Sequence, residues 1–276
     1  MTWYLGLTCA LSYPHFRRNV KKRPMNANDS LAGGKPTETL TQHCGCATAA
    51  GAASAETGAS GIGRIMSHFE AMVDHCYDYA AEAKQQGRPI VGIMCEYTPR
   101  EIIFAAGGVP VCLCGGSAET IAHAERLLPA NLCPLIKSTF GYHVSGKNPF
   151  LQWADLVVAE TTCDGKKKMF ELMGLSKPMY VLELPQKADD PDALEHWTRE
   201  VRKLKCHLES KFGVQITDDK LRAAIRLMNR ERRLRRQLAE QVAQEQPPAT
   251  GRQVLEFKSI ISGIETDLHQ YEQALQ

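Results

Sequence analysis

The sequence predicts an α/β fold, in which a doubly wound parallel sheet is followed by a helical segment. Short apolar runs alternate with helical patterns between residues 61 and 190, which is the order that a parallel sheet requires. From Pro191 onward the apolar residues recur at helical spacing alone. We therefore expect three parts: a tail over 1–60, a parallel α/β domain over 61–190 and a helical segment over 191–276.

The first 60 residues predict a disordered tail. The stretch from Met25 to residue 60 is rich in Gly, Ala, Ser and Thr and has few large apolar residues, so it cannot bury a core. Met25 is a second candidate start. Cys44 and Cys46 form a CGC motif that could bind metal, but we do not expect a site in such a tail.

The α/β part begins with a helix over residues 64–87, which ends at Gly87. Its apolar residues recur at helical spacing: Ile65, Phe69, Met72, Cys76 and Ala80. A short apolar strand is expected over 89–95.

The four residues TPRE, at positions 98–101, predict the start of the next helix. Thr98 is expected as N-cap, with Pro99 at the first helical position and Glu101 completing a capping box. This helix ends at Gly107, and the strand 109–114 follows. The unit is strand, helix, strand, whose crossover is right-handed.

The same alternation continues to residue 184, with helices over 118–128 and 164–174 and strands over 154–160 and 177–184. This order predicts a Rossmann-like or flavodoxin-like sheet.

Three helices are expected after Pro191, over 192–212, 217–244 and 252–275. The first should bury an apolar stripe: Leu194, Trp197, Val201, Leu204 and Leu208. The second is strongly basic but has an ordinary amphipathic stripe of Leu221, Ile225 and Met228. We interpret its charge as a solvated face, with docking to an acidic partner as the alternative.

Composition and charge narrow the class of protein. The 33 Lys and Arg nearly balance the 31 Asp and Glu, so binding of nucleic acid by phosphate neutralisation is not expected. No apolar run approaches the roughly 20 residues of a membrane helix, and no signal-peptide pattern opens the chain. A cytoplasmic location is expected. Because the cytosol disfavours disulfides, the ten cysteines indicate metal binding, redox chemistry or burial.

Three cysteines fall at the carboxyl ends of predicted strands, where an open parallel sheet binds its ligands. Cys95 ends the first strand, Cys114 ends the second, and Cys163 follows the third at the start of a helix. The helix N-terminus and Lys166, Lys167 and Lys168 favour a thiolate at Cys163.

Cys133 is a fourth candidate, in a Cys-Pro pair that also occurs in ferredoxin-type runs. Pro134 is expected to stop the local helix. Four thiols without convergent histidines or a CxxC motif favour an iron–sulfur cluster over zinc.

Simpler interpretations stand beside this one. Any of these thiols could be a core residue, because free cysteine is often buried. Cys76 and Cys112 are expected to be structural and Cys206 inert. The three lysines could form a solvated helix face. The nine histidines show no HxxxH spacing, so none is expected as a ligand.

Four motifs resemble the family of 2-hydroxyacyl-CoA dehydratases (D-component) and benzoyl-CoA reductases. They are TPREIIFAAGGVPV, LCGG, LCPLIKS and ETTCDGKKKMFELM, and the resemblance extends over residues 62–275. The chain is similar in particular to the double-cubane cluster protein branch. The resemblance implies a low-potential iron–sulfur cofactor, either one [4Fe-4S] cluster or a double cubane. It matches Cys133 and Cys163 to the family's cluster cysteines, and Cys95 and Cys114 to cysteines of the double-cubane branch.

The resemblance also implies partners. An ATP-hydrolysing iron–sulfur activator delivers single electrons, and the cluster-bearing subunits assemble as dimers. Family members have a second α/β domain after the helical segment, and this chain ends within that segment. We therefore expect a missing domain or second subunit to complete the site, with weak iron binding and no turnover by this chain alone. The alternative is a non-catalytic remnant or interaction module of the same fold.

Overall fold

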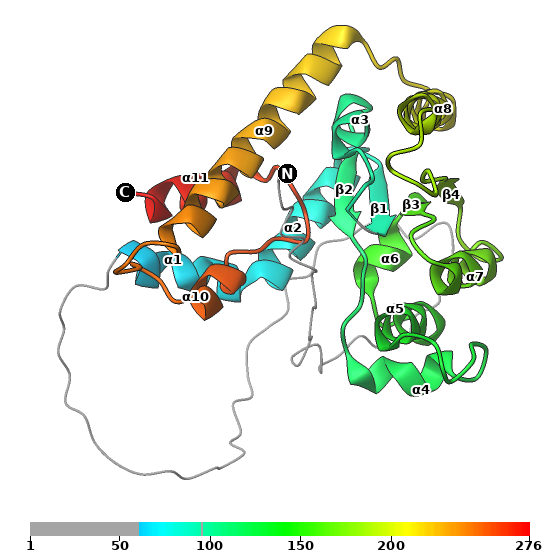
Figure 1. Cartoon of the computed structure of the whole chain (residues 1–276), viewed down its shortest axis with the longest axis horizontal. Helices are drawn as coiled ribbons and strands as arrows, with labels where there is room; N and C mark the ends of the chain where they lie inside the picture. The colour runs from blue at the N-terminus through cyan, green and yellow to red at the C-terminus, as the bar shows by residue number, and fades with distance from the viewer. Residues whose placement is uncertain (1–60, 95) are drawn as a thin grey trace. The chain divides into compact units, whose positions relative to one another are not determined.

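A four-stranded parallel sheet is the centre of the chain, which a computed structural model describes over residues 61–94 and 96–276 (Figure 1). The strands are β1 (Ile90–Met94), β2 (Val109–Cys112), β3 (Leu156–Glu160) and β4 (Met179–Leu182), in the order β2-β1-β3-β4. Ile90 pairs with Val109, Val91 with Leu156 and Val157 with Met179. The predicted tail over 1–60 and Cys95 lie outside the described residues.

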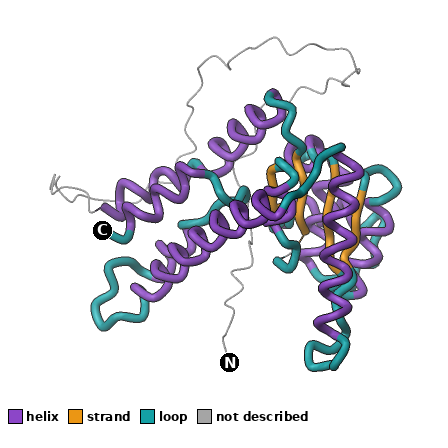
Figure 2. Tube along the Cα trace, turned by 90° about the horizontal axis from the view of Figure 1, so that it is seen from above, coloured by secondary structure: helices purple, strands orange, loops and turns teal. Residues whose placement is uncertain are grey.

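Helices cover both faces of this sheet, so the predicted doubly wound fold is confirmed. The helices before and between the strands are α1 (Gly61–Glu70), α2 (Met72–Gln85), α3 (Arg100–Ala105), the 3₁₀ turn η1 (Ala118–Thr120), α4 (Ile121–Ala124), α5 (Pro134–Ser145), α6 (Pro149–Trp153) and α7 (Asp164–Met173). The helices after β4 are α8 (Ala193–Phe212), α9 (Asp218–Gln241), α10 (Gly251–Glu256) and α11 (Glu265–Ala274). Figure 2 shows the strands between helices on either side.

The two faces of the sheet have separate cores, because alternate residues of a strand point to opposite sides. In β3, Val157 and Ala159 pack in one core, with side chains of α2, α5, α6 and α7. Leu156 and Val158 pack in the other core, with side chains of α3 and α8. Burial on both faces explains why β1 and β3 lack polar alternation.

Several predicted helices differ in their bounds. The helix predicted over 64–87 is two helices that meet at Ala71, and the one over 252–275 is α10 and α11 with a loop between them. Pro134 begins α5 instead of stopping a helix, because the first helical position needs no amide hydrogen. The predicted helix over 118–128 is reduced to η1 and the short α4.

The predicted capping box is wrong. Pro99 is the N-cap of α3 and no side chain caps this helix. Thr98 instead points into the core and donates a hydrogen bond to Oε1 of Glu160 at 2.6 Å. Glu101 forms an ion pair with Arg232 of α9.

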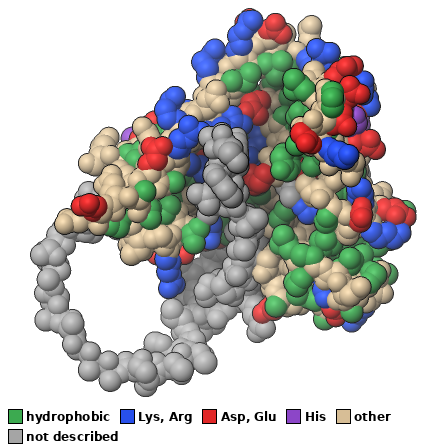
Figure 3. All heavy atoms as spheres, viewed as in Figure 1, with side chains coloured by type: hydrophobic (Ala, Val, Ile, Leu, Met, Phe, Trp, Pro, Cys, Tyr) green, Lys and Arg blue, Asp and Glu red, His purple; other side chains and the backbone are tan. Residues whose placement is uncertain are grey.

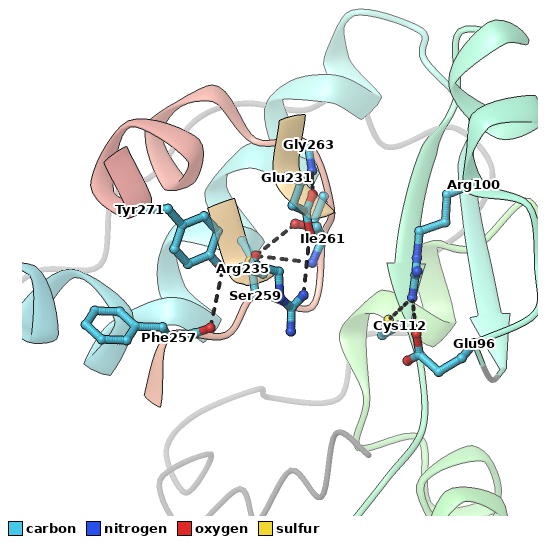
Figure 4. Close-up of polar contacts among 11 residues, drawn as sticks. Glu96, Arg100, Cys112, Glu231, Arg235, Phe257, Ser259, Ile261, Gly263 and Tyr271 are labelled. Carbon is cyan, nitrogen blue, oxygen red and sulfur yellow. Dashed lines mark hydrogen bonds and ion pairs between the residues drawn. The ribbon is translucent and has the colours of Figure 1, made fainter. Parts of the chain in front are cut away.

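A loop near the C-terminus covers the β2 edge of the sheet. The amide of Cys112 donates to the carbonyl of Ile260 at 2.7 Å, and Val111 forms an antiparallel bridge with Ile261. The amide of Gly263 donates to the buried Glu231 of α9 at 2.8 Å, as Figure 4 shows. The helical segment is thus joined to the sheet by backbone hydrogen bonds between residues far apart in the sequence. Local sequence patterns do not predict such bonds.

The basic helix α9 is amphipathic, with many of its arginines paired to acidic groups. Arg230 contacts Glu265 at 2.6 Å and Glu272 at 2.9 Å, and Met228 is buried. Figure 3 shows Lys and Arg side chains along the part of the surface that α9 occupies.

Two residues of the predicted apolar stripes are exposed. Ile225 of α9 is 44% exposed and Leu194 of α8 is 77% exposed, so both predictions of burial are wrong. Each lies at the margin of its stripe, where the packed neighbours no longer cover it.

In the described part of the chain, no helix combines the length and apolar character needed to cross a membrane.

Candidate functional site

The strand order creates a switch point between β1 and β3. The connection after β1 runs through α3 on one face of the sheet, and the connection after β3 runs through α7 on the other. The chain therefore diverges beyond the carboxyl ends of these strands, which is where such sheets bind ligands. The hydrogen bond from Thr98 to the fully buried Glu160 spans this point and fixes the two loops relative to each other.

Cys133 and Cys163 occupy equivalent positions at the starts of two helices. Cys133 is the N-cap of α5 and Cys163 is the N-cap of α7; both have non-helical ψ angles, of 131° and 160°. Neither side chain makes a capping hydrogen bond, and both residues are exposed. Each sulfur atom is thus placed at the positive end of a helix dipole, which favours anionic ligands of a metal.

The starts of these two helices pack against each other at Gly165. A β-carbon at Gly165 would stand 2.8 Å from Cδ1 of Ile136 and 3.2 Å from Cδ2 of Leu132. Leu132 directly precedes Cys133, and Gly165 lies two residues after Cys163. The missing side chain therefore brings the two cysteine-bearing helix ends into close contact.

The segment that carries Cys114 rests on the same helix α5. The amide of Gly115 donates to Oγ1 of Thr139 at 3.0 Å, and a β-carbon there would stand 2.5 Å from Cδ2 of Tyr142. Cys114 itself is half-buried. Helix α5, which the sequence did not predict, is therefore the common support of the segments that carry Cys114, Cys133 and Cys163.

The three described thiols do not form a compact single-ion site. Among the described residues, no three of their ligand atoms lie within 4.8 Å of one another. Cysteines of a cubane bind different iron atoms, so their sulfur atoms are separated by the cluster itself. Cys95 lies outside the described residues. The assignment of Cys95, Cys114, Cys133 and Cys163 as ligands stays a prediction.

The three lysines after Cys163 add less positive potential than their number suggests. Lys167 lies 3.2 Å from Asp164 and Lys168 lies 2.9 Å from Glu171. The side chains of Lys167 and Lys168 are 43% and 54% exposed, so solvent also screens them. Two of the three lysines therefore behave as a solvated helix face.

Cys112 lies beside a guanidinium group, a contact that the strand pattern did not reveal. Arg100 of α3 donates to Sγ of Cys112 at 3.8 Å and to Glu96 at 3.1 Å (Figure 4). Burial raises the pKa of Cys112 above its usual value, although the charge of Arg100 opposes this. A raised pKa disfavours the thiolate form of Cys112, and its structural role stays a prediction.

An open cleft of about 620 Å³ lies beyond the carboxyl ends of β3 and β4. Its walls include Thr161, Lys167 of α7, Glu183 and His196 of α8. Because Thr161 is two residues from Cys163, the cleft begins next to one of the candidate thiols. It offers space for a substrate or partner segment beside the α7 N-terminus.

A second group of potential ligands consists of His68, His75 and Asp267, and the spacing of the histidines did not single it out. The two histidines are seven residues apart, which is two helical turns, and this spacing is the signal that an HxxxH search misses. Burial lowers the pKa of His75, but Asp267 and Cys76 outweigh it and raise the pKa to about 10. Burial raises the pKa of Asp267, but the two histidines and Ser259 hold it below its usual value.

Known proteins with related sequences share the part of the chain that carries the candidate thiols. Residues 95–276 match the family described as 2-hydroxyglutaryl-CoA dehydratase, D-component. A putative dehydratase subunit YjiM from Escherichia coli (strain K12) is 49% identical over 152 residues, which are 55% of this chain and 40% of that protein.

Two further relatives are more distant. The beta subunit of lactoyl-CoA dehydratase from Anaerotignum propionicum is 29% identical over 64% of this chain and 49% of its own length. The beta subunit of (R)-2-hydroxyglutaryl-CoA dehydratase from Acidaminococcus fermentans is 24% identical over 67% of this chain and 49% of its own length. The chain thus spans about half the length of the curated relatives it matches. The family match covers most of the chain, including Cys114, Cys133 and Cys163, and the chain belongs to the 2-hydroxyacyl-CoA dehydratase family.

Proposed function

We propose that this chain is the iron–sulfur part of a subunit of an activator-dependent dehydratase or reductase. The observation that carries the proposal is the contact between the starts of α5 and α7 at Gly165, which brings the N-cap residues Cys133 and Cys163 to one place. Both thiols are exposed and neither makes a capping hydrogen bond, so ligation would break no capping interaction in the fold.

The donor set fits an iron–sulfur cluster better than a hard cation. The residues offered are thiols, from Cys114, Cys133 and Cys163, with Cys95 as a fourth by its place after β1. A cluster held there would supply single low-potential electrons to a thioester or another small substrate. The chain's own residues would position it: α5 supports the ligand segments, and the free amides at the two helix starts offset negative charge.

The relatives suggest the assembly in which such a chain works. Two of them are named as beta subunits of dehydratases, which supports a partner subunit for this chain. We further propose an ATP-hydrolysing iron–sulfur activator as electron donor, and a dimer in which further protein closes the pocket over the thiol edge. The cleft beside Thr161 and Lys167 is the surface we assign to substrate or partner contact.

Anaerobic reconstitution with iron and sulfide tests the proposal. The wild-type chain alone should take up iron and inorganic sulfide weakly, because further protein is expected to complete the site, while Cys133→Ser and Cys163→Ser should each lose most of this uptake. Cys206→Ser is the matched control, because Cys206 is an exposed thiol within α8 and lies in none of the loops that follow the strands. Equal iron in all four proteins would refute the ligand assignment.

The alternative is an interaction module that keeps the fold without the cofactor. It is motivated by the coverage of the relatives, because the chain spans only about half of their length. A chain that folds, stays colourless after reconstitution and leaves Cys133 and Cys163 open to alkylation would support this alternative. Iron uptake that depends on these two thiols would exclude it.

A further inference from the structure

Three side chains from both ends of the described chain converge at one point. His68 of α1 and His75 of α2 place Nε2 at 2.7 Å and 3.1 Å from the same oxygen, Oδ1 of Asp267 in α11. The two imidazole rings stack with centroids 4.4 Å apart and planes inclined by 22°. Their nitrogens and a carboxylate oxygen all lie within 4.8 Å of one another. The two ring nitrogens thus converge on one carboxylate oxygen.

The group is buried on one side and open on the other. The side chain of Asp267 is only 3% exposed, whereas those of His68 and His75 are 23% and 22% exposed. Carboxylate and imidazole groups are seldom buried without partners, because losing water costs free energy. Here Oδ2 of Asp267 and Nε2 of His75 are buried without an aligned hydrogen bond. Nε2 of His75 thus contacts Asp267 as an ion pair at 3.1 Å without an aligned hydrogen bond.

The surroundings hold these three side chains in place. Phe69 stacks on Tyr271 at 5.0 Å, and the edge of Phe69 meets His68 at the same distance. Beneath them Leu268 and Tyr271 are each 1% exposed. An apolar shell of this kind fixes the orientation of the ligands on the buried side.

From this geometry we propose that His68, His75 and Asp267 bind a divalent transition-metal ion such as Zn²⁺. Imidazole nitrogen with one carboxylate suits zinc and its neighbours in the first transition row, whereas Mg²⁺ and Ca²⁺ prefer oxygen alone. Three protein ligands leave one position for water on the side that the histidines leave open. The ligand elements are α1, α2 and α11, and none of them carries a candidate cluster cysteine.

The position of the site suggests what the ion would do. Residues 68 and 267 are 199 positions apart, so one ion would fasten the first two helices to the last. A ligand that binds only the folded chain stabilises it in proportion to the logarithm of its concentration above Kd. The ion would therefore act as a structural clamp between the two ends of the described chain.

Metal titration of the chelator-treated full chain, after alkylation of its accessible thiols, tests the clamp. Co²⁺ serves as the spectroscopic probe, because thiolate ligation produces a sulfur charge-transfer band that nitrogen and oxygen ligands lack. We expect one Co²⁺ per chain with visible bands and no sulfur band, and competition by Zn²⁺. We also expect stoichiometric Zn²⁺ to raise the Tm.

Variants separate a metal site from a plain ion-pair network. His68→Gln, at a partly exposed position, and Asp267→Asn should each weaken binding by at least about a hundredfold, which is the upper end of the loss seen for mere supporting residues. His269→Gln is the control, because it lies exposed on α11 two residues from Asp267. Equal affinity in His68→Gln, His269→Gln and wild type, or no Co²⁺ binding by wild type, would overturn the proposal. Since His68 is partly exposed, its variant remains informative if Asp267→Asn fails to fold.

Discussion

Gly165 and Ile136 touch so closely that a β-carbon on the glycine would stand 2.8 Å from Cδ1 of the isoleucine. Ile136 lies in the first turn of α5 and Gly165 in the first turn of α7. The contact is therefore between the two helix starts that carry Cys133 and Cys163. The effect of this contact on the free energy of unfolding can be measured separately from its effect on iron uptake.

The first prediction concerns this contact. Gly165→Val should push the two helix starts apart, with a loss of about 1–3 kcal/mol in the free energy of unfolding, because the new methyl groups overlap Ile136 and Leu132. Iron uptake in reconstitution should fall while the circular dichroism stays helical. Gly251→Val is the control, since its β-carbon would meet nothing within 4 Å. Unchanged iron content in Gly165→Val would mean that the contact does not set the cluster geometry.

Gly141 permits a second close approach, between α5 and η1. A β-carbon there would overlap the carbonyl oxygen of Thr120, which is backbone and cannot move like a side chain. Gly141→Ala should therefore destabilise the chain by about 1–3 kcal/mol. Gly251→Ala should be neutral or stabilise by up to about 1 kcal/mol. Urea denaturation of both variants tests this prediction. Equal midpoints would show that α5 moves to accommodate the new methyl group without losing stability.

The buried hydrogen bond across the switch point gives a third prediction. Thr98→Val keeps the shape of the side chain but removes the donor to Glu160, so unfolding should become easier by about 1–3 kcal/mol. Thr198→Val is the control, because that hydroxyl bonds to Leu194 in its own helix and lies at the surface. A loss in Thr98→Val no larger than in Thr198→Val would contradict the role given to this bond.

Alkylation should sort the cysteines by environment. Cys133, Cys163 and Cys206 are exposed and should react readily with iodoacetamide. Cys76 is fully buried, and burial raises the pKa of Cys112, so both should react far more slowly. After reconstitution Cys133 and Cys163 should become protected while Cys206 stays reactive. Peptide mass spectrometry reads every site at once, and rapid labelling of Cys112 would count against its assignment.

The acid stability should depend on Glu200 of α8. Burial raises its pKa, but Lys203 at 2.6 Å and the amide of Glu183 outweigh burial and hold it below the usual 4.5. A lowered pKa means that this contribution is complete above pH 4.5 and is lost as the pH falls through the folded-state value. Glu200→Gln should therefore lower stability near neutral pH and flatten its acid decline. If stability falls equally steeply with decreasing pH in the wild type and in Glu200→Gln, this prediction is wrong.

Local spacing in the sequence was sufficient to predict the strands and most of the helices. The runs 90–94 and 156–159 carry no charged residue and are followed by turn residues, and the structure confirms them as parts of parallel strands. The same spacing placed Cys114 and Cys163 after two strands, because the carboxyl ends of parallel strands meet at one edge. Strand and helix patterns depend on residues close together in the sequence, so they can be recognised within one short stretch of chain.

Tertiary packing determines which of these local elements contact one another. Thr98 looked like a helix cap, but a buried carboxyl at position 160 offered its hydroxyl a stronger partner than a surface helix start. Helix α5 lacks a clear amphipathic stripe because it is buried on several sides, so periodicity could not reveal it. Asp267 reaches His68 across 199 residues of chain, and no pattern within a single helix contains that distance. Such contacts depend on how whole elements pack, because packing is set by the shapes of both partners at once.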